Sequence, residues 1–488
     1  MFTWLKHFFF TNHTTRQTVA KNTFWMAVGQ MGGRVIRAVV IIYAARVLGA
    51  AEWGAFSYAM SFAAFLTIFT DLGLSPVLTR ETAKTQDEKI KSEILSTALV
   101  LKISLLFCAG LLVVFAGPRF TVIDATVSLF PLIALVVMFD GFREFGFALT
   151  RAKERMEWEA GLFLLTNAAI VVAGFIALSY APSVFWFTAA YAIGTGVGAV
   201  ATYFALRRYV VNIFRHFSLK LVRPLFQSAW PFAISTALGA LMINTDLLVI
   251  GLLRPAEDVG FYSAAEKIIL ILYLFPGILA SATFPTLARF ASEGNDKLRT
   301  ALERSIAMIF LVAIPMALGG IIVAPYLISF LYGASYLPAV PSFQILLLAV
   351  LVNFPAALIS NALFAMNRQK DLVAFVAIGG IANIILDFIL IPLFGIVGSA
   401  WATLGAQLLS NTYLWRTLKK TQPFSVFTHL RHVLVGSAVV VAVTWGTLFL
   451  TQNLFAALAV AFASYFGTLY YFREPLLKEI KTTLRPSA

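Results

Sequence analysis

Two arginines, Arg34 and Arg37, lie inside the apolar stretch GQMGGRVIRAVVIIYAARVLG, which covers residues 29–49. Residues three apart lie on one face of a helix, so both side chains would point to the same place. An arginine at the centre of a bilayer costs at least about 2.5–3.5 kcal/mol. Guanidinium groups form paired hydrogen bonds with phosphate and carboxylate oxygens. If this stretch crosses a membrane, the pair predicts a binding site for an anionic ligand.

The composition places the chain in a membrane. Of its 488 residues, 60% are hydrophobic and 12% are charged, against about 25% charged in soluble domains. Fourteen apolar segments are each long enough to cross roughly 30 Å of hydrocarbon as a helix. Alternating patterns are absent, which favours helices over a barrel. The predicted spans are 23–47, 53–79, 94–116, 126–149, 158–180, 183–206, 224–252, 259–287, 303–323, 342–366, 372–392, 396–415, 431–451 and 454–472.

The distribution of lysine and arginine predicts the orientation of these spans. An even number of spans puts both termini on one side, and 29 of the 37 basic residues fall in segments on that side, against 3 on the other. Basic residues concentrate in cytoplasmic loops, so we expect a plasma-membrane protein with both termini in the cytoplasm. The net charge of +14 therefore does not require a nucleic-acid partner. The single cysteine, Cys108, excludes an intramolecular disulfide.

Two pairs of similar phrases predict an internal repeat. PVLTR at 76–80 resembles PTLAR at 285–289, and EWGAFSYA at 52–59 resembles EDVGFYSA at 257–264. The pattern predicts an all-α polytopic fold of two parallel six-helix lobes around a central cavity, with two helices appended. The expected parts are a cytoplasmic interfacial segment (1–21), an N-lobe (22–208), a cytoplasmic linker (209–223), a C-lobe (224–417), two further helices (430–472) and a cytoplasmic tail (473–488).

The first lobe carries further charges within its spans. Asp140, Arg143 and Glu144 lie on one helix face, and mutual neutralisation is the favoured interpretation. Lys102 is close enough to a span end to extend its ammonium group to the membrane surface, which is the interpretation favoured for it. Asp71 could do the same, or could neutralise one of the two arginines of the first span.

The second lobe holds fewer basic residues within its spans. Glu266 and Lys267 are adjacent, so their side chains should point in different directions and not form a simple pair. Glu266 is then a possible cavity or structural charge.

Oxygen-bearing residues gather in three later spans. Asp246 stands in NTD, Asn383 and Asp387 are one turn apart in NIILD, and Ser399 and Thr403 are one turn apart in SAWAT. Carboxylate, amide and hydroxyl oxygens suit a hard monovalent cation. Hydrogen bonding between membrane helices uses the same residue types, and the residues alone leave both interpretations open.

Longer phrases of the chain resemble a known family. ARVLGAAEWGAFSYAMSF, DLGLSPVLTRETAK, FLYGASYLPAVPSFQIL and ALFAMNRQKD occur in an order similar to that of the polysaccharide transporter family. Its members are lipid-linked oligosaccharide flippases of the multidrug/oligosaccharidyl-lipid/polysaccharide exporter superfamily. The resemblance covers about residues 22–472. It implies movement of an undecaprenyl-pyrophosphate-linked repeat unit, such as that of O-antigen, from the inner to the outer leaflet, alongside a polymerase or glycosyltransferases of cell-envelope polysaccharide biosynthesis.

The resemblance also implies roles for individual residues. Relatives that move lipid II hold the pyrophosphate in a cationic cavity with arginines of the first span, and Arg34 and Arg37 match these in span and depth. Lys267 lies in the eighth span, which also lines that cavity in the relatives, so the resemblance implies that it binds the same anion. Some relatives carry a sodium site, so Na⁺ is the expected coupling ion, with H⁺ as the alternative, and no other cofactor is expected. The family varies widely in its cavity residues, so the identity of the glycan is not inherited. The residues of this chain that follow the sodium-site pattern are Asp246, Asn383, Asp387, Ser399 and Thr403.

Three other functions compete with this one. A lipid II flippase of the same superfamily would use the same chemistry. A drug/cation antiporter would move organic cations, which Arg34 and Arg37 would repel. A membrane glycosyltransferase or polymerase would need catalytic carboxylates outside the membrane, where the chain offers only short turns. Those turns contain Glu52, Asp124, Glu257 and Asp258.

Overall fold

The computed structural model describes residues 15–475, except for 86, 211–215, 294 and 427–429. Within these residues the chain is helical and contains no strand. It divides into two compact units, Met1–Gly260 and Phe261–Ala488.

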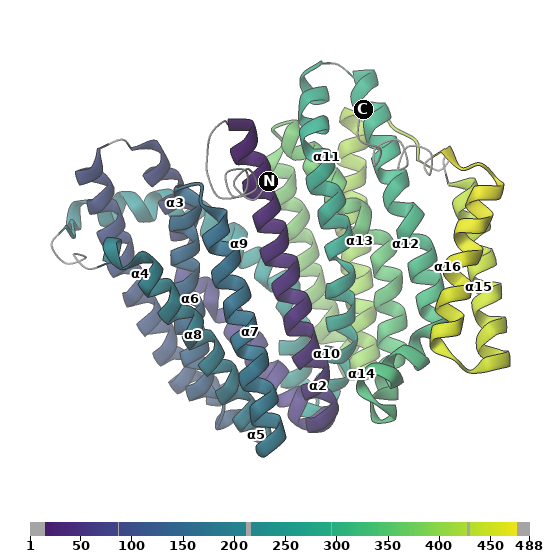
Figure 1. The fold of residues 1–488 in the computed structure, drawn as a ribbon, viewed down its shortest axis with the longest axis horizontal. Coiled ribbons are helices and arrows are strands. Elements are labelled where there is room, and N and C mark those ends of the chain that lie inside the picture. The colour runs from purple at the N-terminus through teal and green to yellow at the C-terminus, as the bar shows by residue number, and fades with distance from the viewer. Residues whose placement is uncertain (1–14, 86, 211–215, 294, 427–429, 476–488) are drawn as a thin grey trace, which may run out of the picture. The chain divides into compact units, whose positions relative to one another are not determined.

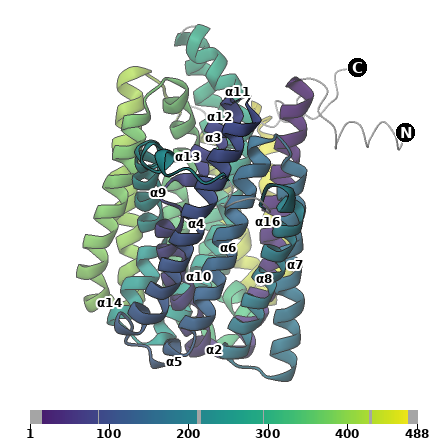
Figure 2. The same cartoon turned by 90° about the vertical axis from the view of Figure 1, so that its left-hand side faces the viewer.

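The first unit is a bundle of long helices that follow the predicted apolar runs (Figures 1 and 2). The long helix α2 contains two helices that meet at Gly49, whose φ of 77° suits glycine. Helix α4 begins at a regular cap, because the Asp87 carboxylate accepts from the N–H groups of Lys89 and Ile90. The helices of the unit are α2 (Thr15–Asp71), α3 (Leu74–Lys84), α4 (Glu88–Ala116), α5 (Asp124–Val127), α6 (Phe130–Ala152), α7 (Met156–Tyr180), α8 (Val184–Val210), α9 (Leu219–Leu253) and the first residues of α10 (Ala256–Leu272), with a short 3₁₀ turn at Gly117–Arg119.

A break between α2 and α3 interrupts the second predicted span. Leu72 and Gly73 both have positive φ, 42° and 78°, and Gly73 packs so closely on α9 that an added Cβ would lie 2.3 Å from the Ala229 carbonyl oxygen. The predicted span 53–79 is therefore interrupted, and its last residues belong to α3. Backbone irregularity at membrane depth is tolerated only where it is buried or lines a cavity. Here the freed N–H of Ser75 donates to the Asp71 carboxylate.

The second unit contains the remaining helices (Figure 1). Helix α14 contains two helices that meet at Gly395, with φ of 61°, and α10 gives way to α11 at Tyr273, so the predicted span 259–287 is interrupted as well. Helices α15 and α16 pack on each other. The helices of the unit are the rest of α10, α11 (Leu274–Glu293), α12 (Asn295–Tyr332), α13 (Val340–Ala365), α14 (Gln369–Thr421), α15 (Arg431–Thr451) and α16 (Leu454–Tyr471), with a 3₁₀ segment at Ala334–Ala339.

These elements make the chain a multi-pass membrane protein. Ten segments of the described chain are long and apolar enough to cross a membrane as helices. With α2 and α14 each counted as two helices, and α10 with α11 as one interrupted span, the arrangement is consistent with the fourteen predicted spans. Large apolar side chains such as Phe107, Phe115, Val172, Trp445 and Phe462 remain exposed, as expected of surfaces that face lipid.

The predicted domain limits stay predictions. Along the chain, the first compact unit ends at Gly260 and the second begins at Phe261. Helix α9 begins at Leu219, within the segment 209–223 that was predicted to be a linker. The proposed interfacial segment falls outside the described residues up to position 14, and most of the proposed tail does so from position 476.

Candidate functional site

The two arginines of the first span differ in their surroundings. Arg34 is exposed on α2 and has neither a hydrogen bond nor an ion pair with any residue that the structure describes. Arg37 is half-buried, and its Nη1 donates to the hydroxyl of Tyr191 on α8 at 2.8 Å. Tyr191 is itself 4% exposed and packs edge-on against Phe56. One guanidinium is therefore held in place by a rigid phenol, and its neighbour is open to a ligand.

Lys267, the third predicted ligand of the anion, lies in the second unit. Its Nζ is 3.2 Å from the Glu266 carboxylate, so the expectation that these neighbours do not pair was wrong. Adjacent residues leave a helix in different directions, but the flexible lysine chain is long enough to turn back to its neighbour. The positive charge of Lys267 is thus partly compensated, unlike that of Arg34.

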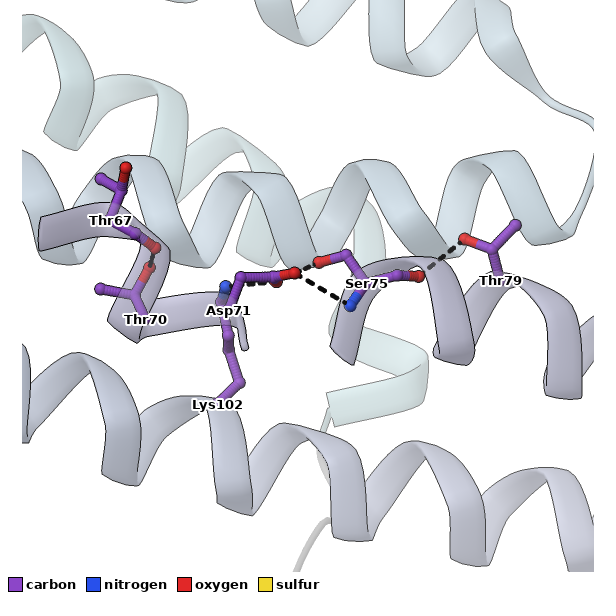
Figure 3. A network of polar contacts seen from close by, with 6 residues as sticks. All are labelled: Thr67, Thr70, Asp71, Ser75, Thr79 and Lys102. Atoms are coloured by element: carbon purple, nitrogen blue, oxygen red, sulfur yellow. Dashed lines mark hydrogen bonds and ion pairs between the residues drawn. The ribbon is translucent and has the colours of Figure 1, made fainter. Parts of the chain in front are cut away.

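A buried ion pair joins Lys102 on α4 to Asp71 at the end of α2 (Figure 3). The Lys102 Nζ lies 2.8 Å from Asp71 Oδ1, and the lysine side chain is 1% exposed. Asp71 also accepts from the backbone N–H of Ser75 at 3.3 Å and from the Ser75 hydroxyl. The interpretation of Lys102 as a residue that reaches the membrane surface was therefore wrong. Lys102 instead binds Asp71, which lies at the break between α2 and α3. The negative charge of Asp71 faces the N-terminus of α3.

The charges of α6 are partly paired with each other. Arg143 Nη1 lies 2.8 Å from Asp140 Oδ1, which confirms the predicted neutralisation for these two residues. The contact is an ion pair but not a well-aligned hydrogen bond, because Asp140 Oδ1 has no hydrogen-bond partner among the described residues. Arg143 Nε is also buried without a hydrogen-bond partner among these residues. The guanidinium also lies over the rings of Phe147 and Phe163, at 5.6 and 5.8 Å from their centroids. Glu144 is exposed and has no hydrogen bond or ion pair to a described residue.

These charges surround one cavity of the first unit, with a volume of about 450 Å³. It lies among α2, α3, α4, α6 and α9, and three carboxylates and two cations give its wall a formal charge of −1. Hydroxyl groups of Thr67, Thr70, Ser75 and Thr236 add to the polar part of the wall. The charged residues on the wall are Asp71, Lys102, Asp140, Arg143 and Glu144. Arg34 and Arg37 do not line this cavity.

Three of the residues predicted for a cation site lie together in the second unit. Asp387 is fully buried and accepts hydrogen bonds from Asn383 Nδ2 at 3.1 Å and from Ser399 Oγ at 3.0 Å. Thr403 lies one turn beyond Ser399, and its hydroxyl is 3.2 Å from that of Tyr262. Among the described residues no cluster of three or more histidine, cysteine or acidic side chains forms a metal centre. Asp246, the fifth predicted ligand, is buried on α9 in the first unit.

Comparison with known proteins decides the family. A family model described as "Polysaccharide biosynthesis protein" matches residues 19–291, which is more than half of the chain, and a second model, MatE, matches residues 231–389. The chain belongs to the polysaccharide biosynthesis protein family. This assignment confirms the resemblance found in the sequence. Together with the transporters and flippases among its relatives, described next, it identifies the protein as a membrane transporter and not an enzyme.

Individual relatives agree with this family. The chain is 23% identical over 403 residues to a probable low-salt glycan biosynthesis flippase of Haloferax volcanii, covering 79% of this chain and 80% of the relative. It is 21% identical over 396 residues to a putative O-antigen transporter of Shigella flexneri, covering 78% and 93%. Among solved structures, the lipid II flippase MurJ in an inward closed conformation has a TM-score of 0.78 at 17% identity, covering 92% of this chain and 99% of that one.

Two tyrosines near the predicted site residues were not predicted from the sequence. Tyr191 and Tyr262 contact predicted site residues, yet they lie 154 and 141 positions from Arg37 and Thr403. A tyrosine in an apolar helix gives no local signal of its partner. Tyr262 does stand in the repeated phrase EDVGFYSA, which could have marked it.

Two carboxylates of the short turns that the sequence predicts to lie outside the membrane have structural partners. Glu52 accepts from the backbone N–H of Val184 at 2.8 Å, at the start of α8. Asp258 pairs with Arg254 at 2.7 Å. These two groups therefore serve the connections between helices.

Proposed function

We propose that the protein is a flippase that moves an undecaprenyl-pyrophosphate-linked oligosaccharide from the inner to the outer leaflet by alternating access. The family assignment supports the handling of a glycan in a membrane. The names of the Haloferax and Shigella relatives, a glycan biosynthesis flippase and an O-antigen transporter, support a flippase for a polysaccharide repeat unit.

The observation that carries the proposal is the state of the two arginines. Arg34 has no protein partner among the described residues, and Arg37 is held by Tyr191. A pyrophosphate offers several anionic oxygens, and guanidinium groups bind such oxygens in pairs. Lys267 is paired with Glu266, so we assign the pyrophosphate to Arg34 and Arg37. An organic cation would be repelled by an uncompensated Arg34, which disfavours a drug/cation antiporter.

We further propose that a cation gradient supplies direction. Leaflet exchange of a lipid is otherwise symmetric, and the sequence contains no nucleotide-binding motif. Moving one charge across the membrane is worth about 2.3 kcal/mol per 100 mV. Asp387 with Asn383 and Ser399 offers a carboxylate, an amide and a hydroxyl within hydrogen-bond distance. Sodium is the proposed ion, with Thr403 as a further ligand in the second unit, and a proton is the alternative.

The orientation of the chain is part of the proposal. With both termini cytoplasmic, cysteines placed at Val122 and Gln452 in a Cys108→Ala background should react with a membrane-impermeant maleimide added to intact cells. Cysteines at Thr85 and Glu154 should react only after the membrane is opened. The reverse pattern would contradict the proposed orientation.

The flipping proposal is tested with full-length protein in vesicles. An undecaprenyl-pyrophosphate disaccharide with a fluorescent label on the sugar reports flipping, because an impermeant quencher removes the signal only from the outer leaflet. Arg34→Ala and Arg37→Ala should each reduce the rate to background at normal protein levels. Lysine at either position should restore part of it, because charge returns without the paired hydrogen bonds.

The matched control is Arg254→Ala, which removes an arginine that is paired with Asp258 outside the spans. It should flip at the rate of the unchanged protein. Wild-type rates for both Arg34→Ala and Arg37→Ala would refute the pyrophosphate assignment. If the unchanged protein moves lipid II but not the disaccharide lipid, the proposed substrate is wrong and lipid II takes its place.

A further inference from the structure

We propose that Tyr262 is a positioning residue of the cation site, because its hydroxyl accepts the hydroxyl hydrogen of Thr403 and so turns the threonine oxygen toward the bound ion. This inference rests on the proposed cation coupling and adds to it a residue outside the five predicted ligands. Tyr262 lies on α10 and Thr403 on α14, and both belong to the second unit.

The side chains around Asp387 fit a monovalent cation. Asn383 Nδ2 and Ser399 Oγ donate to the two oxygens of its carboxylate, at 3.1 and 3.0 Å. Because the single hydroxyl hydrogen of Ser399 is used in this bond, the lone pairs of its oxygen point elsewhere. Carboxylate, amide and hydroxyl oxygens are the ligands that suit a hard monovalent cation. The residues present therefore fit sodium.

The hydroxyl of Thr403 needs an acceptor for its hydrogen before it can serve as a further ligand. Thr403 lies one turn beyond Ser399 on the same helix. A hydroxyl has one hydrogen and two lone pairs, and it binds a cation through its oxygen, with the hydrogen directed away from the positive charge. An acceptor for that hydrogen preorganises the ligand. A donor to the oxygen would instead occupy a lone pair and compete with the ion.

Tyr262 lies where such an acceptor is needed. Its hydroxyl oxygen is 3.2 Å from Thr403 Oγ1, and the residue is 0% exposed. The preceding residue, Phe261, packs edge-on against the buried Tyr336, with 5.8 Å between the ring centroids. A tyrosine has only two side-chain torsions, so its buried hydroxyl stays in one place. The threonine hydroxyl rotates to suit its partner, and Tyr262 therefore fixes its direction.

The length of this contact sets the size of the expected effect. Hydrogen bonds between hydroxyl groups usually measure about 2.5–3.0 Å, so the 3.2 Å between Tyr262 and Thr403 indicates a bond at the weak end of the range. Loss of an ordinary hydrogen bond changes an equilibrium constant roughly two- to tenfold. We therefore expect a loss of about threefold in sodium affinity when the phenol hydroxyl is removed.

Calorimetric titration of sodium into the purified full-length protein in lipid nanodiscs tests the inference. Tyr262→Phe removes the hydroxyl but keeps the ring, so the variant should fold, and it should bind sodium about threefold more weakly than the unchanged protein. The matched control is Tyr465→Phe, which removes another buried phenol hydroxyl, the donor to the Leu311 carbonyl of α12. This control should bind sodium like the unchanged protein.

A double-mutant cycle distinguishes positioning from other roles of Tyr262. Thr403→Val removes the threonine hydroxyl at similar shape, and Thr403→Ser keeps it. If Tyr262 acts through Thr403, then Tyr262→Phe should weaken sodium binding in the serine background and have no further effect in the valine background. A loss that persists in the valine background would come from direct ion binding or from a general change of the fold. Either cause would overturn the positioning role.

The sign of the change is also decisive. Unchanged sodium affinity in Tyr262→Phe would overturn the inference, and so would tighter binding, because tighter binding would mean that the phenol donates to Thr403 and competes with the ion. The proposed cation coupling fails in a different way. If the unchanged protein binds no sodium, the coupling and this inference are both refuted. If Asp387→Ala abolishes sodium binding and Tyr262→Phe leaves it unaltered, only this inference is refuted.

Discussion

The ion pair of Lys102 and Asp71 provides a sharp test of how this fold is held together. Lys102 is 1% exposed and has Asp71 as its single hydrogen-bond partner among the described residues, at 2.8 Å. Asp71 is 23% exposed and also accepts from Ser75. Removing one partner of a buried pair leaves an uncompensated charge and costs about 3–5 kcal/mol. Asp71→Asn, which strands the more buried Lys102, should cost more than Lys102→Met, which leaves Asp71 with its Ser75 contacts.

The double variant Asp71→Asn/Lys102→Met separates charge from packing. It leaves no ion unpaired, and replacing both members of a buried pair is often neutral. We expect it to be more stable than either single variant. Thermal unfolding of the purified protein is the assay, with each single variant lowering the apparent Tm by on the order of 10 °C. Additive losses, with the double variant the least stable of the three, would refute the reasoning that the pair is one unit.

Three further predictions follow from the geometry. Gly73→Ala should lower stability by about 2 kcal/mol or more, since φ is 78° and its Cβ would lie 2.3 Å from a carbonyl oxygen. Its matched control, Gly161→Ala, whose added Cβ would meet nothing within 4 Å, should leave stability unchanged or raise it by up to about 1 kcal/mol in the same thermal assay. Tyr191→Phe should keep the fold but slow flipping several-fold, because Arg37 loses the group that orients it; an unchanged rate would remove Tyr191 from the site. Asp387→Ala should abolish sodium binding measured by calorimetry on purified protein, and unchanged sodium binding would refute the proposed cation site.

The sequence by itself determined the membrane character of the chain, the approximate limits of its helices and its family. Hydrophobic length is a local property, and so is the face that a residue takes on a helix. The Asp140–Arg143 pair was predictable for that reason, since both residues lie on one face of a single helix, three positions apart. The resemblance to the family depended on the order of several phrases along the chain, which is also sequence information.

The tertiary structure decided which charges meet. Lys102 reaches Asp71 across 31 positions, and Arg37 reaches Tyr191 across 154. Periodicity assigns a residue to a face of its helix but does not tell which neighbouring helix covers that face. The break at Leu72 and Gly73 turns the end of the second span so that Asp71 faces Lys102 and the start of α3. Only the packing of α2, α4 and α6 brings their charges to one cavity, because helix neighbours are chosen by side-chain contacts between segments far apart in the chain.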